Sequence, residues 1–320
     1  MTRGLRAAGA VAGVTAAAGL AAFAYGALVE RVQWTVREEV LPILGPGARP
    51  ITVLHLSDVH MAPWQDGKQD FIRSLAVYEP DLVIDTGDAY GHPDALEALR
   101  WAYEPFRGTP GVFVHGSNDY YGPRFKNPLR YLGAPSTRAE KPIRLDIDGL
   151  GHLFGEELGW LDLNNRARAI ELRGTRIELF GTNDAHREWD RLDLLPGAVD
   201  EMRENVEWSA GTGEKVLSLG VTHAPYRRVL DAFVTHGAEL IFAGHTHGGQ
   251  VRVPGVPALV TNCDIPPAQA QGLSVWQHGR ASAFLEVSAG IGTSIYAPVR
   301  FATPPEAVVV TLTPVDIGYS

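Results

Sequence analysis

The feature that most restricts the fold of this chain is a set of five short polar motifs, each of which follows an apolar run. The apolar runs cover residues 51–56, 82–84, 111–114, 215–221 and 239–243. Their length and content are typical of buried strands, and segments of helical periodicity lie between them. This alternation predicts a layered α/β domain. The five motifs are Asp58-Val59-His60, Gly87-Asp88, Gly116-Ser117-Asn118-Asp119, Thr222-His223 and Gly244-His245-Thr246-His247.

The positions of these motifs predict that they meet in space. Ligands of open α/β sheets gather at the carboxyl ends of the strands, where the loops converge. In an extended segment, Asp58 and His60 point the same way, and so do His245 and His247. We therefore expect each pair to face one site from one side. Outside the motifs, strands are expected at 32–40, 143–147, 169–172, 176–180, 281–287 and 307–312.

The residue types indicate a metal centre and exclude several other functions. Carboxylate and imidazole together suit zinc, iron or manganese. The chain has a single cysteine, Cys263, which argues against an iron–sulfur cluster or a zinc finger. The formal net charge is −9, so a bulk electrostatic grip on nucleic acid is not expected. An acidic protein can still bind phosphate where metal ions reverse the local field.

In order and spacing, the motifs over residues 51–250 resemble those of the calcineurin-like metallophosphoesterases. The stretches at 56–60 and 244–250 are especially similar to the bacterial membrane-anchored branch of that family. The resemblance implies two packed mixed β-sheets flanked by helices, a four-layer α-β-β-α sandwich, over residues 33–320. It also implies a phosphodiesterase, phosphomonoesterase or pyrophosphate hydrolase that uses a hydroxide held between two divalent ions (Mn, Fe or Zn).

The same resemblance implies which residues bind the metals. Asp88 would bridge the two ions. The first ion would be held by Asp58, His60, Asp88 and His247, and the second by Asp88, Asn118, His223 and His245.

The 116–119 loop departs from the family pattern, which has Gly-Asn-His-Asp. Strict alignment places Ser117 at the metal-binding asparagine, whereas a small shift makes Asn118 the ligand. An amide oxygen is the better ligand for a divalent cation, so we expect Asn118. The family's catalytic histidine is missing here, and asparagine cannot act as a general acid. We expect Asn118 and Asp119 at the catalytic site, with His186 as a replacement proton donor from the similar stretch 181–186 and Asp184 of the same stretch as the alternative. The alternative is a catalytically weakened metal-dependent phosphate-binding or scaffold protein.

The N-terminal segment, residues 1–32, is expected to be a membrane anchor or a signal segment. Residues 7–29 contain no acidic or basic side chain. This run is long enough to cross a bilayer as a helix. Arg3 and Arg6 favour an inside N-terminus and an extracytoplasmic catalytic domain, while Arg31 and Arg37 weaken that orientation. Secretion after signal cleavage is the alternative. A lipid-linked or cell-envelope substrate would fit an anchored enzyme; some members of that branch resemble UDP-diacylglucosamine pyrophosphate hydrolases. The oligomeric state is left open.

Overall fold

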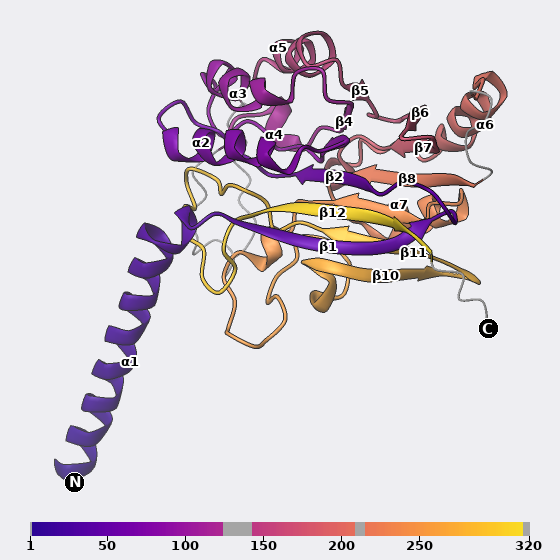
Figure 1. The fold of residues 1–320 in the computed structure, drawn as a ribbon. Helices are drawn as coiled ribbons and strands as arrows, with labels where there is room; N and C mark the ends of the chain where they lie inside the picture. Colours follow the sequence, from indigo (N-terminus) through magenta and orange to yellow (C-terminus); the bar gives the residue numbers. More distant parts are fainter. Residues whose placement is uncertain (1, 124–142, 209–214, 316–320) are drawn as a thin grey trace.

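Two mixed β-sheets pack face to face in residues 2–123, 143–208 and 215–315, which the computed structural model describes (Figure 1). The first sheet has the order β1-β12-β2-β3-β4-β5 and the second β10-β11-β9-β8-β7-β6. The strands of the first sheet are β1 (Thr35–Leu44), β2 (Ile51–Leu56), β3 (Leu82–Asp85), β4 (Gly111–Phe113), β5 (Leu161–Asp162) and β12 (Glu306–Pro314). Those of the second are β6 (Arg166–Leu172), β7 (Thr175–Gly181), β8 (Val216–Thr222), β9 (Leu240–Ala243), β10 (Gly272–His278) and β11 (Ala281–Val287).

Each sheet combines parallel and antiparallel pairs. Strands β2 to β5 run parallel, while β12 pairs with β2 in the antiparallel sense. In the second sheet β7, β8, β9 and β11 are parallel, and β6 and β10 flank them as antiparallel edges. The parallel strands of both sheets carry the five motifs at their ends.

Three apolar clusters hold the layers together. The central cluster lies between the two sheets and includes Val53 from β2, Leu219 from β8 and Val310 from β12, all fully buried. A second cluster joins the first sheet to its helices, and a third joins the second sheet to its own. The predicted two packed mixed sheets flanked by helices are therefore confirmed. The helices are α2 (Asp66–Ser74), α3 (Leu96–Tyr103), α4 (Ser117–Tyr120), α5 (Ile147–His152), α6 (Leu195–Asn205) and α7 (Arg227–Thr235).

Two predicted strands differ in the structure. The segment 143–147 is not a strand, because the Asp146 side chain accepts a hydrogen bond from the Gly149 amide at 2.9 Å and starts α5. The first strand is displaced from 32–40 to Thr35–Leu44 and continues through Pro42. Proline is tolerated there because β1 lies at the edge of its sheet, where one side needs no ladder hydrogen bond.

Helix α1 (Thr2–Leu28) projects away from the sheets (Figure 1). The side chains of residues 1–12 and 14 lie outside the described part, so the predicted apolar run 7–29 is described mainly in its second half. Within the described part, no helix combines the length and the apolar content that crossing a bilayer requires. The predicted membrane-spanning anchor is not supported by this finding and stays a prediction.

Candidate metal centre

The five motifs meet at one end of the sandwich, where loops of both sheets contact each other. The His245 amide, after β9, donates to Asp58 Oδ2, after β2, at 2.8 Å. His223 Nδ1, after β8, lies 2.8 Å from the Thr86 carbonyl oxygen, after β3. These cross-sheet contacts join segments that are 137 and 187 positions apart in the chain. The predicted convergence of the loops is therefore present.

One group of potential ligand atoms consists of Asp58, His60 and His247. The three ligand atoms all lie within 4.8 Å of one another. His247 Nε2 is 3.4 Å from Asp58 Oδ1 and 3.3 Å from His60 Nε2. Asp58 Oδ1 is buried and has no hydrogen-bond partner among the described residues. An unpartnered carboxylate oxygen facing two imidazole nitrogens fits a cation, because a cation would satisfy all three.

A second group consists of Asp58, Asp88 and His223, again within 4.8 Å of one another. Asp88 Oδ2 lies 3.5 Å from His223 Nε2 and 3.7 Å from His60 Nε2. A single oxygen of Asp88 thus stands between the histidines of the two groups. His245 joins the second group, since its Nδ1 is 3.3 Å from His223 Nε2.

The Asn118 side chain reaches the same place. Its backbone amide donates to Asp88 Oδ1 at 2.8 Å, and its side-chain Nδ2 donates to Asp88 Oδ2 at 2.6 Å. A half-turn of the amide group would exchange Nδ2 for the oxygen and present an acceptor instead. Asn118 is therefore placed where an amide ligand could be offered beside Asp88.

The backbone that carries these ligands is not extended, contrary to our expectation. Asp58 and His60 have φ of 48° and 44°, and His245 and His247 have φ of 67° and 48°. Asp88 has φ of 57°. Each such non-glycine residue costs about 1–3 kcal/mol, and residues of this kind cluster at functional sites. Tight left-handed turns, rather than strand alternation, aim these side chains inward.

Hydrogen bonds from the far side of each ring orient His223 and His245. The Thr86 carbonyl accepts from Nδ1 of His223, which leaves Nε2 with its lone pair toward Asp88. The Asn262 carbonyl oxygen lies 3.3 Å from Nε2 of His245, which leaves Nδ1 toward His223. Fixing the tautomer through the outer nitrogen is how proteins orient a metal-binding histidine.

Electrostatics divide the buried histidines into rings that are neutral and a ring, His223, that is held in the charged form by Asp88 while no cation occupies the site. Burial lowers the pKa of His245 to about 3 and that of His247 to about 4, so both rings are neutral at neutral pH. Burial also disfavours the charged form of His223, but Asp88 outweighs it and raises the pKa of His223 well above its usual range. Burial opposes ionisation of Asp88, yet His223 and His60 hold its pKa well below the usual range. A metal ion would take over the stabilisation of this carboxylate.

Two glycines are required because side chains crowd them. A Cβ at Gly116 would lie 2.2 Å from Asp88 Oδ1 and 2.7 Å from His223 Nε2. A Cβ at Gly244 would lie 1.8 Å from Ser57 Oγ and 2.5 Å from Asp58 Oδ2. The absence of a side chain at these positions leaves the space in which the ligand atoms approach one another.

Asp119, expected at the catalytic site, has its carboxylate engaged by backbone amides of the loops that carry the ligands, and its catalytic role stays a prediction. The side chain is fully buried. Oδ2 accepts from the amides of Asp88 and Gly116, each at 2.9 Å. Oδ1 accepts from Ala89 at 2.7 Å and from Tyr90 at 3.3 Å. With both oxygens occupied by backbone donors, Asp119 holds the 87–90 loop against the 116–119 loop.

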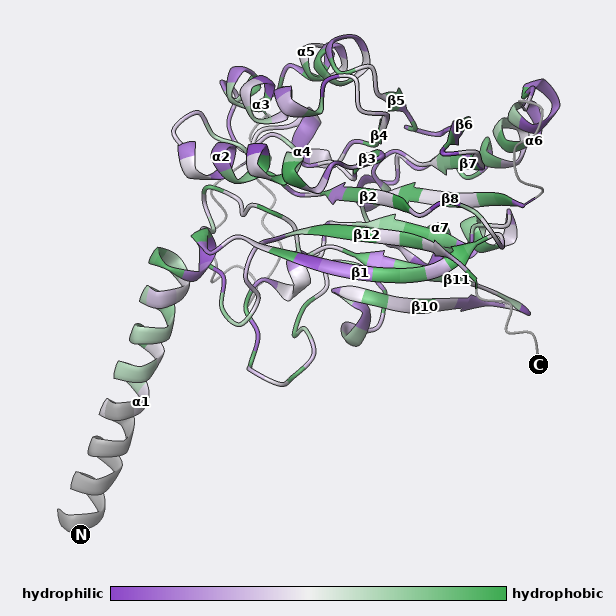
Figure 2. Cartoon of the chain, viewed as in Figure 1, coloured by the Kyte–Doolittle hydropathy of each residue, from purple (hydrophilic) through white to green (hydrophobic). Residues whose placement is uncertain are grey.

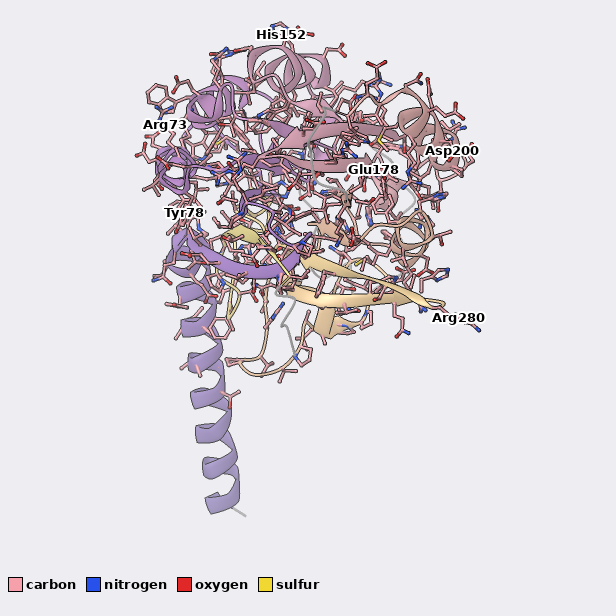
Figure 3. All side chains as sticks on the ribbon, turned by 45° about the vertical axis from the view of Figure 1, so that its right-hand side comes forward. Arg73, Tyr78, His152, Glu178, Asp200 and Arg280 are labelled. Carbon is pink, nitrogen blue, oxygen red and sulfur yellow. The ribbon has the colours of Figure 1, made fainter. Side chains whose placement is uncertain are left out.

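His186 lies beside the second group of ligand atoms. Its ring centroid is 4.7 Å from that of His245, and its Nδ1 is 3.0 Å from the Tyr226 hydroxyl. The Tyr226 hydroxyl in turn donates to the Asn262 carbonyl at 3.2 Å. The side chain is exposed, so it stands at the rim of the site rather than within it. By contrast, His152 is exposed on α5, at the top of the molecule in Figure 3.

Several residues that support the site carry no recognisable sequence signal. The buried Lys68 donates to the carbonyls of Val59 at 2.7 Å and His60 at 3.1 Å. The buried Arg300 donates to the carbonyls of residues 289, 290 and 292, and its Nη2 is 3.3 Å from His247 Nδ1. Arg300 is far from His247 in the sequence, and Lys68 lies inside helix α2, so no local sequence pattern marks either residue. Ser57, which donates to Asp58 Oδ2 at 2.6 Å, directly precedes the first motif, within the stretch 56–60.

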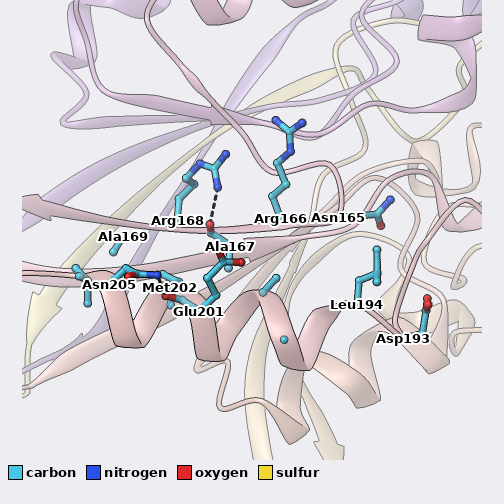
Figure 4. A pocket seen from close by; sticks show the side chains of 13 residues that line it. Asn165, Arg166, Ala167, Arg168, Ala169, Asp193, Leu194, Glu201, Met202 and Asn205 are labelled. Atoms are coloured by element: carbon cyan, nitrogen blue, oxygen red, sulfur yellow. Dashed lines mark hydrogen bonds between the residues drawn. The ribbon is translucent and has the colours of Figure 1, made fainter.

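An open groove of about 820 Å³ lies elsewhere, between β6 and α6 (Figure 4). Its described lining includes Arg166, Arg168 and Glu201, but none of the predicted metal ligands. Arg168 is turned toward its own strand, where Nη1 donates to the Ala167 carbonyl at 2.9 Å. This groove therefore does not belong to the metal centre.

Comparison with known proteins agrees with the geometry. A family model described as calcineurin-like phosphoesterase matches residues 51–249. The uncharacterized protein YpbG of Bacillus subtilis is 26% identical over 277 residues, which cover 83% of this chain and 82% of that protein. The uncharacterized metallophosphoesterase YkuE of the same bacterium is 22% identical over 294 residues, 89% of this chain and 86% of that protein. A Bos taurus transmembrane protein with a metallophosphoesterase domain is 26% identical over 238 residues, 68% of this chain and 45% of that protein.

Proposed function

The chain belongs to the calcineurin-like phosphoesterase family and is a metal-dependent phosphoester hydrolase. We propose that it works with two divalent ions, bound where the two groups of potential ligand atoms around Asp58 and Asp88 meet. The observation that carries the proposal is the position of Asp88 Oδ2 between His223 and His60, at 3.5 and 3.7 Å. The proposed ligands are Asp58, His60, Asp88 and His247 for one ion, and Asp88, Asn118, His223 and His245 for the other.

The residues of the chain have distinct tasks in this proposal. When bound, the ions supply Lewis-acid activation of water and of the phosphoryl group. Asp88 contributes the negative charge shared by both halves of the site. Thr86 and Asn262 hold His223 and His245 in the tautomers that leave a lone pair inward. Asp119 keeps the loop of Asp88 in register with that of Asn118.

Turnover of a soluble aryl phosphodiester tests the hydrolase directly. We expect dialysed protein to regain hydrolysis when manganese, iron or zinc is added, in proportion to the metal bound. The second candidate is a phosphate-binding or scaffold protein, favoured by the fact that the 116–119 loop offers no imidazole. Tight binding of two ions without turnover of any phosphoester in a substrate panel would establish that second candidate.

We propose His186 as the proton donor to the leaving group. With Nδ1 at the Tyr226 hydroxyl, we assign the transferred proton to Nε2. General acid catalysis contributes about 10²–10⁴-fold, and more of it is needed when the leaving group is a poor one. His186→Asn should therefore lower kcat for an alkyl phosphoester by about 10²-fold, while a nitrophenyl ester is affected far less. The basic limb of the pH–rate profile should disappear in the same variant.

The matched control for this variant is His152→Asn, which removes an exposed imidazole on α5. It should leave both substrates and the pH profile unchanged. Equal losses on alkyl and nitrophenyl substrates in His186→Asn would argue for a structural role and against proton transfer.

We further propose that the N-terminal segment holds the enzyme at a membrane, with the catalytic domain on the extracytoplasmic side and a lipid-linked phosphoester as the substrate class. Residues 7–29 contain one proline-free stretch without any charged side chain. The name of the Bos taurus relative, a transmembrane protein, supports a membrane setting. The orientation rests on Arg3 and Arg6 alone.

Deleting residues 1–24 should move the protein from the membrane pellet to the supernatant. The cut is placed before Tyr25 because the following residues contact the body: Gly26 accepts from the Arg300 amide at 3.1 Å, and Glu30 accepts from the Thr303 amide at 2.7 Å. The melting temperature of the truncated protein and its rate on a soluble phosphodiester should match those of the full chain. Persistent pelleting of the truncated protein would contradict the anchor.

A further inference from the structure

One exposed loop of the protein is unusually apolar. The loop 251–260 follows η7 (His247–Gly249) and leads toward η8 (Pro267–Gln269), and all of its residues except Arg252 and Ala258 are exposed. From 253 to 263 it contains no acidic or basic residue. Exposed loops are ordinarily polar, and clustered apolar exposure marks an interaction surface. Its exposed aliphatic side chains are Val251 (45%), Val253 (52%), Val256 (45%), Leu259 (62%) and Val260 (62%).

This loop is fastened to the base of α1. Val251 forms a parallel bridge with Phe301, and the Arg252 amide donates to the Phe301 carbonyl at 2.9 Å. The neighbouring Arg300 amide donates to the Gly26 carbonyl in α1, and the rings of Tyr25 and Phe301 meet edge to face at 6.3 Å. Both views of the whole molecule place α1 and this loop on the same side of the sheets (Figures 1 and 3).

The same end of α1 is apolar and uncovered. Leu20, Phe23 and Leu28 are 70%, 60% and 72% exposed. Figure 2 shows hydrophobic residues both along this part of α1 and on the loops below the sheets. A single helix that projects without a packing partner has marginal stability in water. We therefore expect a binding partner to bury its apolar side chains. Because the loop is continuous with this end of the helix, one occupant would cover both.

The charges at the edges of this surface favour lipid as that occupant. Arg31 follows α1 and donates to the Ala27 carbonyl, and Arg252 stands at the stem of the loop. Arginine side chains beside an apolar stretch suit the phosphate level of a bilayer. Their aliphatic part can lie against the apolar region while the guanidinium contacts lipid phosphates. A protein partner would require directional polar contacts, which the uncharged 253–263 stretch offers poorly.

We propose that the loop 251–260 inserts into the headgroup region of a lipid bilayer beside α1 and so presents the metal centre to phosphoesters at the membrane surface. The inference rests on the proposed membrane association. Both ends of the loop adjoin the site: the loop follows η7, which contains His247, and just after it the Asn262 carbonyl oxygen lies 3.3 Å from His245 Nε2. The substrate class that this arrangement fits is a lipid whose phosphoester lies at headgroup depth.

An environment-sensitive fluorophore in the full chain tests the insertion. Leu259→Cys is labelled in a Cys263→Ser background, since Cys263 is the native thiol. The matched control is Leu194→Cys, 46% exposed at the start of α6, on the opposite side of the molecule from α1 (Figure 1). Both proteins are reconstituted into vesicles of phosphatidylcholine and phosphatidylglycerol that carry a nitroxide in the upper acyl chain.

The nitroxide lipid should quench most of the emission at position 259 and leave position 194 unchanged. A blue-shifted label at 259 that the nitroxide does not quench would mean that protein, such as a second copy of the chain, covers the loop, and would overturn the proposal. A water-exposed label at 259 in vesicle-bound protein would overturn it as well. Unchanged metal-dependent turnover of a soluble phosphodiester in the same samples would show that the hydrolase assignment stands even where the insertion of the loop does not. Loss of vesicle binding would overturn the membrane association itself.

Discussion

Replacing Asp88 with asparagine is expected to abolish phosphoester hydrolysis and to reduce the bound metal from two ions toward one or none. Asp88 Oδ2 stands 3.5 Å from His223 Nε2 and 3.7 Å from His60 Nε2, and the asparagine amide would place a neutral group there. A loss of about 4 kcal/mol in transition-state stabilisation corresponds to about 10³-fold in rate, and we expect at least that much. Metal content after dialysis and the rate on an aryl phosphodiester give the two readouts.

The metal-free form of this variant offers a third readout. Because the pKa of Asp88 lies well below its usual range, its carboxylate stabilises the folded state above the unfolded pKa of about 3.9 and ceases to do so as the pH falls further. The asparagine variant should lose that part of the acid dependence of unfolding. Asp193→Asn, which alters an exposed carboxylate beside Arg191, is the control. Full activity with two ions bound in the Asp88 variant would refute the bridging role.

The regular part of the fold follows from local patterns. Continuous apolar runs predict β2, β3, β8 and β9 because these strands are buried on both faces, and such strands leave a dense apolar signal. The pairing of β1 with β12 is different. These strands are joined by parallel pairing across about 270 positions, and no periodicity within either strand specifies a partner so distant. The strand expected at 143–147 does not form because the Asp146 carboxylate caps helix α5, which begins at Ile147 and ends the extended segment.

The ligand set was predictable because its residue types and order are chemically restrictive, whereas its geometry was not. Sequence alternation predicts that Asp58 and His60 lie on one face of an extended strand, but both residues have positive φ and a left-handed backbone conformation. Local propensity disfavours that conformation, so tertiary contacts must impose it. Lys68 supplies such contacts by donating to the carbonyls of Val59 and His60. A lysine in a helix carries no sign of this task, because its partners are set by the packing of α2 on the loop.

Asp119→Asn is expected to destabilise the fold and to lower activity together. The carboxylate accepts four backbone hydrogen bonds, from residues 88, 89, 90 and 116. Asparagine has one acceptor oxygen, so its NH2 group would face two of these amides. Each buried donor left without an acceptor costs about 1–3 kcal/mol, which predicts a loss of about 2–6 kcal/mol in the free energy of unfolding. Urea unfolding of the metal-free protein measures that loss without interference from metal binding.

The combined readout separates a positioning residue from a proton donor. If Asp119 acted on the substrate, the isosteric amide would remove activity while leaving the urea midpoint in place. If Asp119 holds the loops, activity and the urea midpoint both fall. Metal affinity falls with them, because the hydrogen bond that Asp119 Oδ2 accepts from the Asp88 amide sets the position of the central ligand. His186→Asn completes the comparison, since an exposed rim residue should lose turnover on poor leaving groups and retain full stability. The two variants are therefore expected to differ in opposite ways: Asp119→Asn loses stability and metal affinity, whereas His186→Asn loses only turnover. A stable Asp119→Asn protein that binds its metal fully but is inactive would show instead that Asp119 acts in catalysis.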